Sequence, residues 1–146
     1  MLRQLLIVLA LFVDLGLAFA ESPDTRQTLE DIKIPMRDGE TLAADIVLPR
    51  GNGPFPTIYV HTPYRRQNVA EPIPASANEK ILLDREHFAY VATDWRGKFG
   101  SKDAKTWNSN DHLGEDGYDT VEWIAKQPWS NGQIGMWGLS APGAAA

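Results

Sequence analysis

Three short apolar runs, separated by stretches with helical spacing, constrain the fold of this chain more than any other feature. They are Thr57 to Val60, Phe88 to Thr93 and Ile134 to Trp137. Runs of this length that are rich in β-branched and aromatic residues suit strands buried on both faces. Residues 75–87 and 115–127 lie between them and have the spacing of helices. Strands that alternate with helices predict an α/β fold with a mostly parallel sheet centre.

A β-hairpin precedes this alternating part. Residues 31–36 alternate polar and apolar side chains, as a strand with one buried face does, and residues 41–48 return as its partner. Asp38 and Gly39 lie between them, and Asp-Gly favours a tight turn because glycine adopts positive φ without strain. Residues 21–29 are polar and without pattern, so we expect a loose leader there.

The remaining patterns separate buried from exposed positions. Four apolar residues of the helix expected over 115–127 share one face, which we expect to pack on the sheet: Tyr118, Val121, Trp123 and Ile124. Residues 95–113 are rich in Gly, Lys, Ser, Asn and Asp, and predict a long surface loop. The adjacent pair Arg65-Arg66 is interpreted as part of a solvated loop.

The first twenty residues have the pattern of a targeting segment. Arg3 gives a positive start, an apolar run extends from Leu5 to Val13, and Ala18-Phe19-Ala20 is a small-x-small cleavage site. The run is shorter than the roughly 20 apolar residues that cross a bilayer, and Asp14 interrupts it. We therefore expect a signal peptide over residues 1–20, a secreted or periplasmic protein, and no stable membrane anchor after cleavage.

Charge and cysteine content exclude several classes of function. The net charge is −5 at pH 7 and no Lys/Arg stripe is present, which argues against a nucleic-acid surface. The absence of cysteine excludes a disulfide framework, a thiolate metal site and a cysteine nucleophile. The acidic stretch 108–119 lacks the glycine of a calcium-binding EF-hand loop, because Leu113 stands in its place. We expect neither a metal nor a cofactor.

The candidate chemistry lies at Ser140, which follows the last apolar strand. A serine on a sharp turn between a buried strand and a helix is a nucleophile elbow, in which only small neighbours fit. Gly138 and Ala141 meet that demand, although Pro142 stands where the usual Gly-x-Ser-x-Gly pattern has its second glycine. The turn exposes the serine hydroxyl and leaves the Ala141 N–H at a helix N-terminus, where it can bind an oxyanion. The sequence Gly138 to Gly143 by itself also fits an ordinary turn that caps a helix. Its position after a buried strand is what favours a nucleophile elbow.

Five blocks of sequence carry a more specific pattern. They are Pro35-Met36-Arg37-Asp38-Gly39, Thr62-Pro63-Tyr64, Asp94-Trp95-Arg96-Gly97, Asp116 to Ile124 and Gln127 to Ser140. In this order they resemble the Xaa-Pro dipeptidyl-peptidase and cocaine-esterase-like serine hydrolases. The resemblance implies an incomplete α/β-hydrolase fold over residues 30–146: a β-hairpin, then βαβαβ ending at the nucleophile elbow.

The resemblance also assigns roles to three residues. It implies that Ser140 is the nucleophile, that Ala141 gives the oxyanion a backbone N–H, and that Tyr64 gives it a phenol hydroxyl. The family usually has tyrosine directly after the nucleophile, where this chain has Ala141. We therefore expect a different shape of the pocket around the acyl group.

The histidine base and the acid of a triad do not follow Ser140 in this chain, although α/β-hydrolases place both after the serine. His61, His87 and His112 precede it, and we expect them at strand ends or in loops. A chymotrypsin-like order of His61, Asp94 and Ser140 is rejected, because a chain with two helices does not form a double β-barrel. The strand over 134–137 would also lie uncovered at a sheet edge, which indicates the N-terminal part of a longer, truncated hydrolase.

Two functions remain open on this basis. The first is a serine hydrolase that cleaves a small ester, amide or peptide substrate through an acyl-enzyme on Ser140. The second is a catalytically inactive secreted fragment or binding domain that lacks the triad Asp and His.

Overall fold

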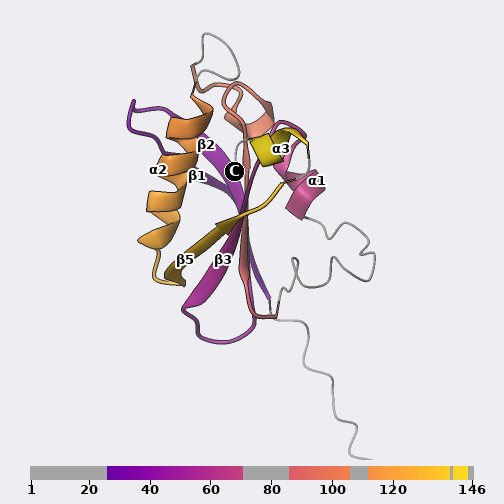
Figure 1. Cartoon of the computed structure of the whole chain (residues 1–146), viewed down its shortest axis with the longest axis vertical. Coiled ribbons are helices and arrows are strands. Elements are labelled where there is room, and N and C mark those ends of the chain that lie inside the picture. The colour runs from indigo at the N-terminus through magenta and orange to yellow at the C-terminus, as the bar shows by residue number, and fades with distance from the viewer. Residues whose placement is uncertain (1–25, 71–85, 106–111, 139, 145–146) are drawn as a thin grey trace, which may run out of the picture.

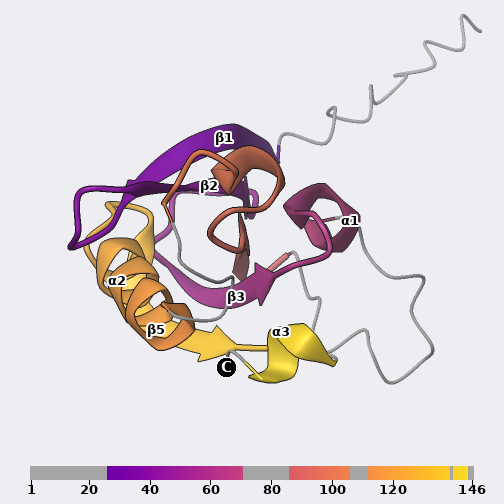
Figure 2. The same cartoon turned by 90° about the horizontal axis from the view of Figure 1, so that it is seen from above.

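The computed structural model describes residues 26–70, 86–105, 112–138 and 140–144, and in these a five-stranded mixed sheet carries helices on both faces (Figure 1, Figure 2). The strands are β1 (Gln27–Pro35), β2 (Thr41–Leu48), β3 (Phe55–Thr62), β4 (Ala89–Asp94) and β5 (Ser130–Met136). Their order across the sheet is β1-β2-β4-β3-β5. The α/β architecture expected from the alternating pattern is confirmed.

The N-terminal hairpin pairs β1 and β2 antiparallel along their whole length. Gly39 in its turn has φ +88°, the conformation for which the Asp38-Gly39 pair is suited. β1 begins at Gln27, so residues 27–29, which the sequence assigned to the leader, belong to the sheet. A bulge between Leu29 and Ile32 explains the difference, because an extra residue breaks the two-residue alternation that marks a strand.

The second half of the sheet is parallel. β3 lies between β4 and β5 and pairs parallel with both, while β2 pairs antiparallel with β4. The chain passes from β3 through α1 (Arg66–Ala70) to β4, then through the 3-10 turn η1 (Phe99–Ser101) and α2 (Leu113–Ala125) to β5, and continues into α3 (Ala141–Ala144). The helix expected over 75–87 lies almost entirely outside the described residues, as does the expected signal peptide. No helix of the described segments is long and apolar enough to cross a membrane.

Both faces of the central strands are buried, as the apolar runs predict. In β3 the side chain of Tyr59 packs in the cluster that α2 covers, whereas Val60 belongs to a smaller cluster on the opposite face. In β4 the side chains of Val91 and Ala92 divide in the same way. Figure 2 shows α2 on one side of the sheet and α1 and α3 on the other.

The predicted apolar face of α2 is confirmed for Val121, Trp123 and Ile124, which pack against the core, but not for Tyr118. Tyr118 is 60% exposed, whereas Asp116, Thr120 and Ile124 are buried at a spacing of four residues. The apolar pattern included Tyr118 and missed Asp116, because an aspartate is usually a surface residue. The carboxylate is buried because Arg96 binds it with a hydrogen bond of 2.6 Å.

The segment after β4 is less exposed than the sequence predicted. Its described part, residues 95–105, contains η1 and buries Trp95, Arg96, Ser101 and Ala104. The Ser101 hydroxyl donates to the Asp94 carbonyl at 3.0 Å and accepts the Ala43 N–H at 2.9 Å. These bonds attach the segment to β2 and β4, so small polar residues serve here as internal partners.

Candidate active site

The carboxyl ends of β3, β4 and β5 meet at one edge of the sheet. Thr62, the last residue of β3, pairs with Asp94, the last residue of β4, and β5 runs parallel on the other side of β3. In open α/β sheets, ligands bind outside the carboxyl ends of the strands. The segments that carry Tyr64 and Ser140 both begin at this edge, directly after β3 and β5.

Ser140 has a backbone conformation that few side chains adopt. Its φ is +64°, in the left-handed region that costs a residue with a Cβ about 1–2 kcal/mol. The turn from β5 to α3 is tight: a Cβ on Gly143 would lie 2.6 Å from the Gly138 carbonyl oxygen, and a Cβ on Gly138 would overlap the backbone of Pro142 and Gly143. Both glycines are therefore required by the close approach of the two chain segments. Strain at an exposed serine is typical of functional sites, where it holds a reactive side chain in place.

Tyr64 brings a second hydroxyl to this serine. Its phenol oxygen lies 3.4 Å from Ser140 Oγ, although the two residues are 76 positions apart in the chain. This distance is longer than an ordinary O–H···O bond, but hydrogen bonds of catalytic groups are often long before substrate binds. Ala141 begins α3, and the N–H groups of a first helical turn have no partner within the helix. The structure thus brings together the three residues that the sequence singled out.

The histidines do not share this location. His61 is fully buried in β3 between the rings of Tyr59 and Trp95. Burial lowers its pKa to about 3. His87 precedes β4, so the six residues of this strand, at about 3.3 Å each, separate it from the site at the other end. His112 lies before α2, with Nδ1 3.1 Å from Glu115. His87 and His112 thus lie outside the helices and strands, as expected, whereas His61 lies within β3, one residue before its end.

Arg66 is buried, which corrects the expectation of a solvated Arg65-Arg66 pair. Its guanidinium donates to Asp45 at 2.8 Å and to Asp94 at 2.6 Å, and its backbone N–H donates to Asp94 at 2.7 Å. Burial opposes the charged form, but these carboxylates outweigh it and raise the pKa of Arg66 above its ordinary value. The sequence did contain a sign that Arg66 is buried: Asp45 lies within an apolar strand, and a buried carboxylate needs a cation as its partner.

Arg96 forms a second buried network beside α2. It donates two hydrogen bonds to Asp116, at 2.6 and 3.0 Å, and two to Asp38 in the hairpin turn, at 2.8 and 3.3 Å. The hydrogen bonds from Arg96 to Asp116 are the largest cause that raises the pKa of the arginine. The two elements that Arg96 joins, the hairpin and α2, are thereby fixed relative to the end of β4.

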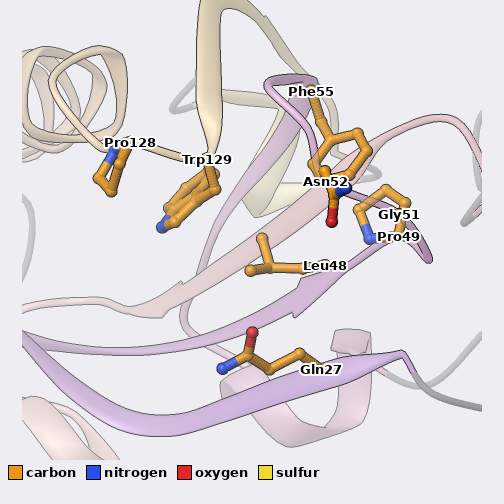
Figure 3. Close-up of a pocket in the computed structure, with 8 residues that line it drawn as sticks. All are labelled: Gln27, Leu48, Pro49, Gly51, Asn52, Phe55, Pro128 and Trp129. Atoms are coloured by element: carbon orange, nitrogen blue, oxygen red, sulfur yellow. The ribbon is translucent and has the colours of Figure 1, made fainter.

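Other parts of the described surface carry less chemistry. Among the described residues, no cluster of histidine and acidic side chains is placed to hold a metal ion, and part of the acidic stretch 108–119 lies outside them. A pocket of about 330 Å³ lies at the starts of β3 and β5, the opposite end of these strands from Ser140, and Figure 3 shows the residues that line it. Its lining residues, none of them charged, are Gln27, Leu48, Pro49, Gly51, Asn52, Phe55, Pro128 and Trp129.

Comparison with known proteins agrees with this geometry. The sequence profile of the X-Pro dipeptidyl-peptidase (S15 family) matches residues 38–146. This chain belongs to that family. Its match therefore includes the turn at Gly39, the Tyr64 segment and the whole strand–serine–helix unit.

Individual relatives cover most of this chain. It is 36% identical over 110 residues to the cocaine esterase of Rhodococcus sp. (strain MB1 Bresler), a match that covers 75% of this chain and 19% of the esterase. The structure is similar to an α-amino acid ester hydrolase, with a TM-score of 0.69, 27% identity, and coverage of 92% and 25% of the two chains. A CocE/NonD family hydrolase from Staphylococcus aureus gives a TM-score of 0.65 and 27% identity, with coverage of 82% and 24%. The chain thus spans about a fifth to a quarter of these relatives, and the α/β-hydrolase fold is confirmed for that part.

Proposed function

We propose that the protein is a serine hydrolase that cleaves an ester or amide bond through an acyl-enzyme on Ser140. The observation that carries this proposal is the exposed serine at φ +64°, whose hydroxyl lies 3.4 Å from that of Tyr64. The family and its relatives are hydrolases of esters and peptides, which supports the same reaction class.

In the proposed mechanism, Ser140 Oγ attacks the substrate carbonyl and its proton passes to a base. The carbonyl oxygen gains negative charge, and the Tyr64 hydroxyl and the Ala141 N–H donate hydrogen bonds to it. Donors held in place before the reaction stabilise this charge more than water does, because they need no reorganisation. The tetrahedral intermediate then collapses: the C–O or C–N bond to the leaving group breaks, and the leaving group takes up the proton held by the base. Water hydrolyses the acyl-enzyme by the same sequence of proton transfers, which regenerates the serine.

The base and its orienting acid are assigned to another part of the whole protein. His61 is enclosed in the core and His112 contacts Glu115, while α/β-hydrolases carry both the base and the acid after the serine. The chain spans 19% of the cocaine esterase it resembles, so most of such a protein lies outside these 146 residues. For this chain by itself, the same observation favours the second candidate: an inactive fragment or binding domain.

We further propose a small ester, amide or peptide as the substrate and a secreted or periplasmic location. The substrate class follows from the hydrolases named above. The location follows from the apolar segment of residues 1–20 and its small-x-small cleavage site.

The test compares the full-length protein that the gene encodes with its variants, on p-nitrophenyl acetate and Gly-Pro-p-nitroanilide. Ser140→Ala is expected to abolish turnover of the accepted substrate. Tyr64→Phe is expected to lower kcat by about 10²–10³-fold, the usual cost of one oxyanion donor. Tyr118→Phe, which changes an exposed tyrosine on α2, is the matched control.

Turnover that survives Ser140→Ala would refute the function. Turnover by residues 21–146 alone that depends on Ser140 would refute the placement of the base.

A further inference from the structure

The backbone of Tyr64 is held by hydrogen bonds on both sides, in the bend that connects β3 to α1. Its N–H donates to Thr62 Oγ1 at 3.0 Å, and its carbonyl accepts from Asn68 Nδ2 at 2.9 Å. Arg65, the next residue, has φ +76°, so the turn includes a strained non-glycine residue. Such a conformation persists only where the surrounding structure imposes it.

The buried side chain of Arg66 holds this strained segment in place. Its backbone N–H and its guanidinium both bind Asp94 at the end of β4, and its Nε binds Asp45 in β2. The arginine side chain is 6% exposed, and the two aspartates are 6% and 0% exposed. The chain two residues after Tyr64 is therefore fixed to two strands of the sheet by charged, buried hydrogen bonds, which are stronger than neutral ones.

Gly100 shows how closely the guanidinium is surrounded. Its N–H donates to Asp94 Oδ2 at 3.0 Å. A Cβ at this position would overlap the Arg66 guanidinium and would lie 2.8 Å from Ala43 Cβ. The absence of a side chain at Gly100 thus leaves the space in which Arg66 and Asp94 meet.

The phenol of Tyr64 depends on this support more than a buried side chain would. Tyr64 is 50% exposed, so packing holds only part of its ring. A misplacement of 1 Å in a catalytic group can cost about 10²-fold in rate. We propose that Arg66 is a positioning residue of the reaction, which holds the Tyr64 hydroxyl against Ser140 through its ion pairs with Asp45 and Asp94. This inference rests on the proposed function, in which the hydroxyl is an oxyanion donor.

A double-mutant cycle in the full-length protein tests the inference. Arg66→Lys keeps the charge but loses the fork that binds both carboxylates. It is expected to lower kcat by about tenfold, with KM little changed, when Tyr64 is present. In the Tyr64→Phe background the same substitution is expected to change kcat less than about twofold, because the group that it positions is absent.

Arg96→Lys is the matched control, since Arg96 is equally buried and ion-paired but contacts the hairpin turn and α2. Its effect on kcat is expected to be the same in both Tyr64 backgrounds. Equal losses from Arg66→Lys in the two backgrounds, or an unchanged kcat in the folded variant, would overturn the positioning role while leaving the proposed function intact. A Tyr64→Phe variant with full activity would overturn both the positioning role of Arg66 and the oxyanion role of Tyr64, whereas the acyl-enzyme on Ser140 is tested separately by Ser140→Ala.

Asp45→Asn provides a second variant in case circular dichroism shows that Arg66→Lys does not fold. It keeps the size of the side chain and leaves Arg66 and Asp94 in place, but it weakens the ion pair of 2.8 Å. The expected result is again a loss of kcat that disappears in the Tyr64→Phe background. A loss of equal size in both backgrounds would contradict the proposal.

Discussion

Two glycines near Ser140 have opposite surroundings, although they lie only three residues apart. A Cβ on Gly138 would overlap the backbone of Pro142 and Gly143, whereas a Cβ on Gly135 would meet nothing within 4 Å. Gly138→Ala is therefore expected to displace the elbow, to lower kcat, and to lower the free energy of unfolding by about 1–3 kcal/mol. Gly135→Ala is the control and should leave both quantities nearly unchanged. Urea unfolding and kcat of the two variants provide the measurement, and equal behaviour would show that the elbow tolerates a side chain.

His61 is expected to make the stability of the protein depend on pH. Neither ring nitrogen has a hydrogen-bond partner in the described structure, and burial lowers the pKa from about 6.5 to about 3. Between these values the unfolded chain binds a proton that the folded chain does not. The free energy of unfolding therefore falls as the pH falls through this window, by up to about 1.4 kcal/mol per pH unit.

The variant His61→Phe removes this contribution. Its free energy of unfolding should decline less than that of the parent protein between pH 7 and pH 4.5, because no imidazole is left to protonate on unfolding. His112→Gln, which changes a histidine beside Glu115 outside the core, should retain the steeper decline. Denaturant titrations at several pH values compare the slopes. Identical slopes for His61→Phe and the parent protein would mean that His61 is protonated inside the fold.

At the scale of elements, Arg96 joins the hairpin turn to α2 across the end of β4. Arg96→Met would leave the Asp116 carboxylate buried without its cation, and removal of one partner of a buried pair typically costs about 3–5 kcal/mol. The exposed ion pair of Lys126 and Glu122, with an N–O distance of 3.5 Å, serves as the control for this buried pair. Lys126→Met should change stability little, since exposed pairs contribute little. Chemical denaturation measures both, and the additional change Asp116→Leu should recover part of the loss. A small effect of Arg96→Met would show that α2 docks through apolar packing alone.

The elements were predictable to different degrees, for identifiable reasons. The runs that became β3 and β4 were evident because strands buried on both faces exclude polar residues. Three of the four apolar residues predicted to face the sheet from α2 do so, but Asp116 was missed because this residue type is usually exposed and here is buried against an arginine 20 residues away. The burial of Arg66 was missed for the same reason: its partners, Asp45 and Asp94, are 21 and 28 residues distant. Local spacing carries no information on such pairs.

At the scale of the whole molecule, the candidate site was predictable because of its topology. Parallel strands place their carboxyl ends at one edge, so a serine after β5 and a tyrosine after β3 could be expected to meet. The resemblance to a known family singled out Tyr64, which would otherwise be one aromatic in a loop. The hydrogen bonds of Arg66 and Gly100 that hold the Tyr64 segment depend on how β2 and β4 pack together. No local pattern in the sequence predicts that packing.

The two edges of the described sheet differ in their protection against association. The outer strand β1 carries Glu30, Asp31 and Lys33, ends in Pro35 and contains a bulge, all of which oppose pairing with another strand. The other outer strand, β5, has neither a charge nor a proline in its seven residues. The described chain by itself is therefore expected to associate through β5 as its concentration rises.

Gly135→Lys tests this expectation, because it places a charge near the carboxyl end of β5, at an exposed position with open space around it. The variant of residues 26–146 should remain monomeric at concentrations where the unmodified segment forms larger species in sedimentation velocity. Gly114→Lys adds the same charge at an equally open, exposed position on α2, and should leave association unchanged. If both lysines reduced association equally, net charge would be the cause. If only Gly135→Lys reduced association, the cause would be the unprotected edge of β5. A charge on this strand acts at the place where a second strand would have to pair with it.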